Sequence, residues 1–285
     1  MTTVAIRLAE TKKRRRSPLV ERIALVVIGL LVLIAVFGPM LAPYDPLKVD
    51  LTQALLPPSA EHWFGTDVNG RDVLSRTLAG ARITLSATGI VLIITLVLGV
   101  TLGTIAALGN RVVDEVIMRI TDIGLALPSI ILALGFAVAL GPGLQSAVIA
   151  VSLTWWPGYA RLVRSVVREV RHAEYVEAGI ALGVGRWRLI RKHILPNSLD
   201  IMYVQVTLDV AAVMLVISGL SFIGVGAQVP SPEWGAMIAA AAGNVTNGWW
   251  SLLFPGLAIA ITAISFNLAG DWIRVKQDPT LREAG

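Results

Sequence analysis

Residues 174–197 have the sequence EYVEAGIALGVGRWRLIRKHILPN, which is polar and strongly basic in a chain that is otherwise mostly apolar. The pattern predicts two short helices, at about 174–182 and 186–194. A glycine turn at Gly183 separates them, because glycine disfavours helix interiors and tolerates positive φ, and Pro196 is expected to end the second helix. Because a helix–turn–helix with so many arginines cannot lie in hydrocarbon, it is expected to stand in water on one side of a bilayer.

The composition of the whole chain indicates a polytopic membrane protein. Of its 285 residues, 55% are apolar and only 15% are charged, and the mean hydropathy is +0.73, whereas soluble domains average about 25% charged residues. Six stretches are apolar, long enough to span a bilayer as helices, and free of the period-2 alternation of strands. They are residues 23–41, 84–108, 116–140, 144–159, 201–225 and 250–268. The chain has no cysteine, which excludes disulfides and thiolate metal sites.

Lysine and arginine are distributed unequally between the two sides of such a six-span protein. Of the 24 Lys and Arg residues, 20 fall in the tail 1–22, the loop near 109–119, the loop 160–200 and the C-terminal segment, and 4 fall on the other side. By the positive-inside rule, both termini and the loop 160–200 are predicted to be cytoplasmic. The net charge of +5 therefore reflects membrane topology, and a nucleic-acid partner is not expected.

The basic stretch also resembles a motif of a known family. Its order Glu177-Ala178-Gly179, Gly183 and Ile194-Leu195-Pro196 is similar to the cytoplasmic EAA loop of bacterial ABC importer permeases, with Gly179 in place of the commoner second alanine. The resemblance implies a coupling helix that docks into a groove on an ATPase subunit. The implied coupling residues are Glu177, Ala178, Gly179, Gly183, Arg186, Leu195 and Pro196. From charge alone, the alternative is an ordinary basic loop held near the membrane by positive-inside bias.

Further motifs resemble the dipeptide, oligopeptide and nickel subfamily of these permeases. They are GTDVNGRDVLSRTLAGAR at 65–82, Leu220–Gly226, Pro232–Gly235 and Asn267–Asp271. The resemblance begins at Ile23 and implies an all-α permease with six transmembrane helices, half of the membrane path of an importer of short peptides. The expected parts are a cytoplasmic tail 1–22, a first helix 23–41, an extracytoplasmic segment 42–82, a core 83–275 with five helices and the coupling loop 160–200, and a cytoplasmic tail 276–285.

The resemblance implies several partners in the inner membrane of a bacterium. A second homologous permease would complete the path, and an extracytoplasmic substrate-binding protein would dock on the outer segments. ATP-binding subunits would hold ATP and Mg. The sequence itself has no Gly-Lys dipeptide and hence no Walker A phosphate loop. The chain is therefore expected to have no cofactor of its own and to be a transport subunit embedded in lipid, not an enzyme.

Asp209 is the candidate for the translocation path, together with Gln205 one turn earlier. A charged residue at the centre of a membrane helix costs roughly 2.5–3.5 kcal/mol on insertion scales, so Asp209 is expected to face the bundle or a water-filled path. It either lines that path or makes a structural hydrogen bond to a neighbouring helix. Related permeases often carry an acidic residue where this chain has Ile217, and this difference leaves the substrate contacts open.

Smaller features lead to further expectations about packing. Gly99 and Gly103 form a G-x-x-x-G motif, which lets another helix approach closely. Arg119 and Asp122 are spaced i,i+3 and are expected to form a local salt bridge. Residues 237–242 are an apolar run in the last outer loop and are expected to fold back as a short helix.

The alternative function is an ion-coupled secondary transporter of small solutes. Such a transporter needs ionisable groups inside the membrane and often has internal repeats, whereas only Asp209 stands deep in a predicted span. The three histidines, His62, His172 and His193, lie far apart in loops without a second strong ligand nearby, so no metal site is expected. No nucleophile and base are paired in the sequence, so no catalytic residue is predicted.

Overall fold

The computed structural model describes residues 18–277, apart from the side chains of Pro18, Arg186, Asp200 and Gln277. Most of the predicted tails 1–22 and 276–285 therefore lies outside the described residues. The longer helices are α1 (Pro18–Leu41), α2 (Val73–Leu108), α3 (Arg111–Ala126), α4 (Ser129–Leu140), α5 (Leu144–Arg171), α8 (Leu195–Ile223) and α11 (Trp250–Gln277). The shorter ones are α6 (Glu174–Ala181), α7 (Arg186–Leu189), α9 (Trp234–Ala241) and α10 (Val245–Gly248). Short 3-10 turns stand at Leu51–Gln53 and Ala242–Asn244, and a π-helical segment, η2, stands at Ile190–Ile194.

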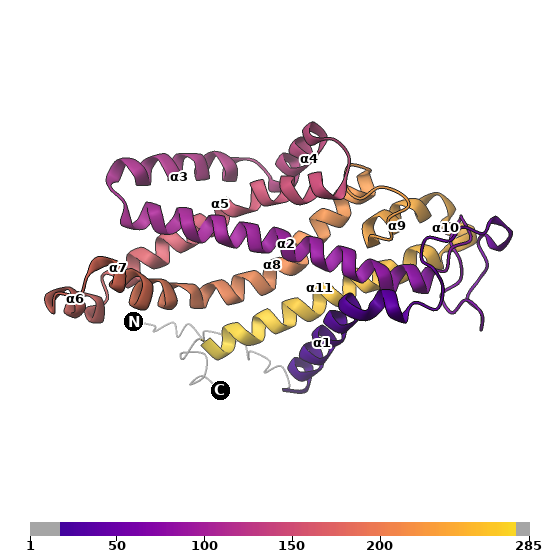
Figure 1. Cartoon of the computed structure of the whole chain (residues 1–285), viewed down its shortest axis with the longest axis horizontal. Coiled ribbons are helices and arrows are strands. Elements are labelled where there is room, and N and C mark those ends of the chain that lie inside the picture. Colours follow the sequence, from indigo (N-terminus) through magenta and orange to yellow (C-terminus); the bar gives the residue numbers. More distant parts are fainter. Residues whose placement is uncertain (1–17, 278–285) are drawn as a thin grey trace, which may run out of the picture.

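The predicted all-α membrane fold is confirmed. Within residues 18–277 the only β pairing is an isolated bridge between Thr66 and Asp72. Four helices, α1, α2, α8 and α11, are long and apolar enough to cross a membrane, and the bent pair α3–α4 makes a fifth if it is counted as one span. The remaining predicted span, residues 144–159, is the apolar first half of α5, whose second half carries four arginines. Helices α2, α5, α8 and α11 run roughly along the long axis of the molecule, and α4 turns away from it (Figure 1).

The connection between α3 and α4 is broken, and this corrects the single helix predicted at 116–140. The two helices meet at an angle of 94°, with Leu127 and Pro128 between them. Proline has no amide hydrogen with which to continue a helix. Leu127, which precedes it, is extended at φ −109° and ψ 148°, as expected for a residue before proline. The third predicted span is therefore two helices that point in different directions.

The two ends of the bundle have different characters (Figure 1). The short helices α6 and α7 project at one end, and the C-terminal end of α11 points toward that end. The opposite end carries the irregular segment 42–72 together with α9 and α10. Helix α2 has 36 residues and is therefore about 54 Å long. Its length is greater than the roughly 30 Å thickness of the hydrocarbon core of a bilayer, so α2 extends into the regions at both ends of the bundle.

The tightest packing in the bundle lies between α2 and α5, where the predicted G-x-x-x-G motif falls. A Cβ atom built on Gly99 would lie 2.3 Å from the Tyr159 Cβ, and one built on Gly103 would lie 2.6 Å from the Ala160 carbonyl oxygen. Distances this short leave no room for a side chain. The two glycines therefore allow the backbones of α2 and α5 to approach closely, as the motif predicts.

Replacing Gly99 with alanine is expected to lower the melting temperature of the purified protein. An overpacked methyl group costs about 1–3 kcal/mol, which outweighs the roughly 1 kcal/mol that alanine gains over glycine inside a helix. Gly89→Ala is the matched control in the same helix, because no atom lies within 4 Å of its added Cβ, and it should not lower the melting temperature. Thermal denaturation in detergent measures both. Equal melting temperatures for the two variants would contradict this account of the packing.

Candidate coupling surface and translocation pocket

Residues 174–194, called the coupling knob below, form α6, a glycine turn, α7 and η2. Gly183 has a φ of +75°, a left-handed conformation that glycine adopts without strain. The knob is anchored by Val176, Leu189 and Ile194, which are buried in one apolar cluster with residues of α5 such as Val167. The knob is therefore packed against the bundle as a fixed projection.

The second helix of the knob does not end at Pro196, contrary to the sequence-based expectation. Helix α7, the π segment η2 and α8 follow one another without a break, and Pro196 lies in the first turn of α8. Proline is tolerated in a first turn, because its missing amide hydrogen has no partner to lose there. The Asn197 side-chain amide donates to the His193 carbonyl oxygen at 2.6 Å and the Ser198 hydroxyl donates to the Ile194 carbonyl oxygen at 2.7 Å. The knob thus continues directly into a membrane helix.

The predicted coupling residues lie on or next to this knob. Glu177, Ala178, Gly183 and Pro196 are exposed, Leu195 is half-buried, and the side chain of Arg186 lies outside the described part of the chain. Gly179 faces inward, and a Cβ added there would lie 2.9 Å from the Leu189 Cδ2. A small residue at this position therefore lets α6 pack on α7.

Large apolar side chains are exposed on the outer surface of the knob. The most exposed are Leu182, with 83% of its surface accessible, and Trp187, with 72%, and Tyr175 and Ile180 are about half exposed. Apolar side chains grouped on a projection that stands in water mark a binding surface for another protein. The same stretch also carries Arg188, Arg191 and Lys192, and such charges disfavour insertion into hydrocarbon.

Ion pairs join α3 to α5 next to this end of the bundle. The Asp114 carboxylate accepts hydrogen bonds from the guanidinium groups of Arg164 and Arg168, each with one contact at 2.7 Å. Asp122 pairs with Arg161. The expected local pair of Arg119 with Asp122 is therefore wrong, and Arg119 lies 3.8 Å from Glu115 on its own helix instead. Arginines of α5 thus pair with Asp114 and Asp122 of α3 at a partly exposed face between the two helices.

Asp209 and Gln205 line a cavity of about 250 Å³. The other walls are Leu125 and Ser129 at the α3–α4 break, and a stretch of α5 that includes Trp155 and Tyr159. The Gln205 side-chain amide lies 3.2 Å from both carboxylate oxygens of Asp209. The two predicted path residues therefore share one cavity between three elements of the bundle, and the one hydrogen-bond partner seen for Asp209 comes from its own helix.

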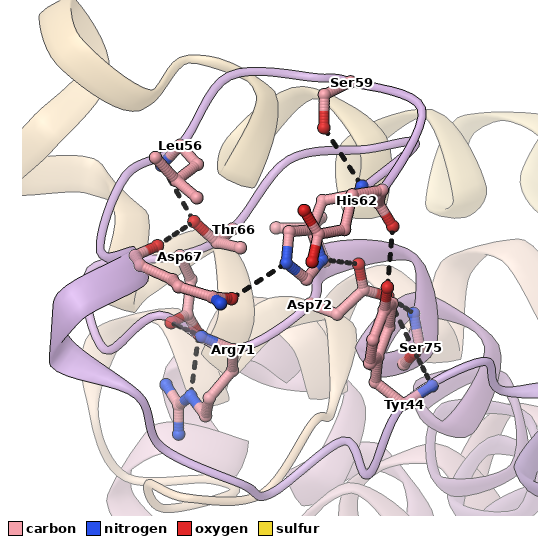
Figure 2. Close-up of polar contacts among 12 residues, drawn as sticks. Tyr44, Leu56, Ser59, His62, Thr66, Asp67, Arg71, Asp72 and Ser75 are labelled. Carbon is pink, nitrogen blue, oxygen red and sulfur yellow. Dashed lines mark hydrogen bonds and ion pairs between the residues drawn. The ribbon is translucent and has the colours of Figure 1, made fainter.

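The opposite end of the bundle is held by a buried polar network (Figure 2). Asp72 caps the start of α2, accepting hydrogen bonds from the amide and hydroxyl of Ser75, both at 2.7 Å. Its other oxygen lies 2.9 Å from His62 Nδ1, and His62 Nε2 lies 3.0 Å from Gln53 Oε1. His62 and Asp72 are almost completely buried. The histidine is thus a structural link, and it fastens the loop 51–62 to the beginning of α2.

Two buried arginines extend this network to the last outer loop. The Arg71 Nε donates to Asp67 Oδ2 at 2.8 Å. Arg76 lies 3.4 Å from the same oxygen and donates to the Pro46 carbonyl oxygen at 2.9 Å. Its guanidinium also reaches the Pro230 carbonyl oxygen at 3.4 Å. Nearer the surface, hydrogen bonds from the Thr52 hydroxyl and amide hold the pKa of Asp50 below its ordinary value.

Helix α9, the short helix expected at 237–242, is fastened by Glu233. Its carboxylate is fully buried and caps α9 by accepting a hydrogen bond from the Ala236 amide at 2.8 Å. The same carboxylate accepts from the hydroxyls of Thr84 on α2, at 3.3 Å, and Ser218 on α8, at 3.2 Å. Trp234 adds a hydrogen bond from its indole nitrogen to the Thr77 carbonyl oxygen at 3.0 Å. The outer ends of α2 and α8 are therefore tied to α9.

Comparison with protein families identifies the chain. Residues 99–283 match the family of binding-protein-dependent transport system inner membrane components. This permease chain belongs to that family. Residues 22–58 also match the N-terminal transmembrane domain of oligopeptide transport permease C. The predicted ABC importer permease is thereby confirmed, and the chain is a permease subunit of that class.

Several characterised permeases are similar over almost the whole chain. The probable D,D-dipeptide transport system permease protein DdpC of Escherichia coli K12 is 46% identical, over 92% of this chain and 88% of its own length. The dipeptide permease DppC of Bacillus subtilis is 40% identical over 88% and 79%. The nickel permease NikC of Escherichia coli K12 is 39% identical over 91% and 94%.

Solved structures share the fold of this permease. A chain of the MetNI methionine ABC transporter in an inward-facing conformation superposes with a TM-score of 0.57 at 21% identity, covering 70% of this chain and 95% of that chain. A second crystal form of the same transporter gives a TM-score of 0.54 at 20% identity, covering 70% of this chain and 96% of that chain.

The sequence analysis missed the apolar surface of the permease's knob. It nominated Glu177 and its neighbours from the motif, whereas Leu182 and Trp187 project furthest into solvent. A signal was present in the sequence, because a leucine and a tryptophan inside a basic, water-exposed loop have no membrane to bury them. The side chains that line the cavity from α5, such as Trp155, were missed because a cavity wall depends on packing between helices that are distant in sequence.

Proposed function

We propose that this permease forms half of the membrane path of an ATP-driven importer of short peptides, with the coupling knob as its contact to the ATPase. The observation that carries the proposal is the knob itself, a projection fixed to the bundle with Leu182 and Trp187 exposed on it. A groove on an ATP-binding subunit would bury these side chains. Because the knob continues into α8 through η2, its movement is transmitted to the membrane helix that carries Asp209.

The ATP-binding subunits hold ATP and Mg. This chain supplies the translocation path and the coupling knob, which transmits movement of the ATPase to α8. A second, homologous permease completes the path, and an extracytoplasmic substrate-binding protein docks on the layer formed by residues 42–72 and α9. Two observations support this orientation in the inner membrane. The C-terminal end of α11 points toward the end of the bundle that carries the knob (Figure 1). Of the 24 Lys and Arg residues, 20 fall in segments assigned to the cytoplasmic side, as the positive-inside rule requires.

Short peptides are the proposed substrate class. The similar permeases of Escherichia coli and Bacillus subtilis are named for D,D-dipeptides and dipeptides, and another is named for nickel. The cavity around Asp209 has one carboxylate and no histidine or thiolate among its lining residues. Such a set is poorly suited to hold nickel, for which imidazole and thiolate are preferred ligands, and this favours an organic substrate.

The test begins with a mild-detergent purification of the tagged chain from its native membrane. A second permease and an ATP-binding subunit are expected to co-purify in fixed stoichiometry. Reconstituted into liposomes with the binding protein, the complex should take up dipeptides when ATP is supplied, and a protonophore should leave that uptake unchanged. A chain that purifies alone, or uptake that collapses with the proton gradient, would instead support an ion-coupled transporter.

A further inference from the structure

The cavity around Asp209 has the electrostatic character of a site for a positively charged group. Asp209 supplies its only carboxylate, and none of the described residues that line it is Lys, Arg or His. The nearest arginine along α5, Arg161, is paired with Asp122. Gln205 occupies one side of the carboxylate with two contacts at 3.2 Å. Because an ionised carboxylate has about four acceptor positions, Asp209 retains the capacity to accept further hydrogen bonds.

The walls next to the carboxylate suit an ammonium group in particular. Trp155 and Tyr159 line the same cavity, and aromatic faces attract organic cations through their quadrupoles. The Tyr159 hydroxyl is buried and has no hydrogen-bond partner within the described residues. A buried hydroxyl in that state is suited to a ligand that brings a new hydrogen-bonding group between it and the carboxylate.

The size of the cavity indicates how much of a substrate it takes. Its volume of about 250 Å³ is below the roughly 300–1,000 Å³ usual for complete small-molecule sites. It therefore accommodates one end of a peptide and not the whole molecule. A divalent cation is a poor alternative occupant, because a single carboxylate with neutral amide and hydroxyl groups gives few strong ligands.

We propose that this cavity receives the free α-ammonium end of a peptide during its passage, with Asp209 as the counter-ion and Trp155 and Tyr159 as the aromatic walls. The assignment rests on the proposed function as a peptide importer. Asp209 stands on α8, which continues from the coupling knob, whereas Tyr159 stands on α5. The knob continues into α8 and also packs against α5 in the apolar cluster that includes Tyr159, so the state of the ATPase can reach both sides of the cavity.

The test compares Asp209→Asn with wild type in liposomes that contain the complete transporter and an excess of binding protein. The substrates are alanyl-alanine and its N-acetylated form, each supplied above its measured Kd for the binding protein. We expect Asp209→Asn to reduce uptake of alanyl-alanine about tenfold, the effect of losing one hydrogen-bonded charge pair. Uptake of the acetylated peptide, which has no ammonium group, should change less than twofold. Glu115→Gln, an acid-to-amide change at an exposed position on α3, should leave both rates unchanged.

Each outcome decides between the two proposals. If the wild-type complex takes up neither peptide, the proposed function fails. If it takes up alanyl-alanine and Asp209→Asn does so equally well, the ammonium site is wrong and the importer stands. An equal loss of uptake for both peptides would show that Asp209 has a structural role, and it would also overturn the ammonium site. Should Asp209→Asn fail to assemble, Tyr159→Phe keeps the ring and removes the hydroxyl; a selective loss of alanyl-alanine uptake supports the site, and unchanged uptake overturns it.

Discussion

Leu182→Asp is expected to abolish most ATP-dependent uptake, by at least about tenfold, while the permease remains in the membrane. Leu182 is the most exposed large side chain of the knob, at 83%. In the proposed complex it is buried in a groove of the ATP-binding subunit, where an unpaired carboxylate would cost several kcal/mol. Each 1.4 kcal/mol is a tenfold change in affinity. Trp187→Asp should act in the same way, because tryptophan is typical of the residues that dominate protein interfaces.

Co-purification of the ATP-binding subunit with the tagged permease, together with peptide uptake, measures this effect. Leu182→Met keeps the apolar surface and should behave as wild type. Val112→Asp is the matched control, since Val112 is an apolar residue of α3 with 69% of its surface exposed, outside the knob. If Leu182→Asp and Val112→Asp retain the ATP-binding subunit equally well, the apolar surface of the knob is not the contact.

Asp72→Ala is expected to loosen the outer layer and to reduce uptake driven by the binding protein, without loss of the ATP-binding subunit. The change leaves His62 Nδ1 and the Ser75 amide and hydroxyl without their acceptor. Leaving a buried hydrogen-bonding group without its partner costs about 1–3 kcal/mol, and a lost helix cap costs about 1 kcal/mol. Asp72 links His62 to the start of α2, whereas Leu55 and Leu56 are held by separate hydrogen bonds to Asp67 and Thr66. The part of the loop around His62 should therefore open first.

Limited proteolysis of the outer segment in sealed right-side-out vesicles measures the opening. Cleavage within residues 45–70 should become much faster in Asp72→Ala. Asp72→Asn should be intermediate, because its amide oxygen can still accept from Ser75. Asp45→Ala is the control: Asp45 makes an exposed contact with the Leu47 amide at 2.8 Å, so its removal should change the cleavage rate little. Wild-type protection in Asp72→Ala would show that other contacts hold the segment.

The sequence was sufficient to predict the fold class, because apolar runs of membrane-spanning length have few alternatives to helices. The break between α3 and α4 was missed for the same reason, since residues 116–140 are mostly apolar, apart from Arg119 and Asp122, and a run of this length conceals the effect of Pro128. Pro196 presents the reverse case. Proline is compatible with the end of one helix or the first turn of the next, and only the π segment before it, which is not visible in the sequence, joins the two helices.

The candidate sites differ in how far the sequence could define them. The motif around Glu177 placed the coupling knob, because its residues are contiguous. The pairing of Asp122 with Arg161 could not be foreseen, since it joins residues 39 positions apart and competes with a local partner of suitable spacing. The aromatic walls opposite Asp209 come from α5 and depend on how α5 and α8 pack. Asp209 itself could be nominated because a carboxylate deep in a span always requires an explanation.

The buried Glu233 has a consequence for experiments that follow the transport cycle with spectroscopic labels. Since its carboxylate is shared by α9, Thr84 of α2 and Ser218 of α8, labels placed on the outer ends of these three helices belong to one rigid body. Distances among them should stay constant while the transporter turns over. The three labelled helix ends of α2, α8 and α9 would thus give a fixed reference, against which the movement of α3, α4 and the knob can be measured.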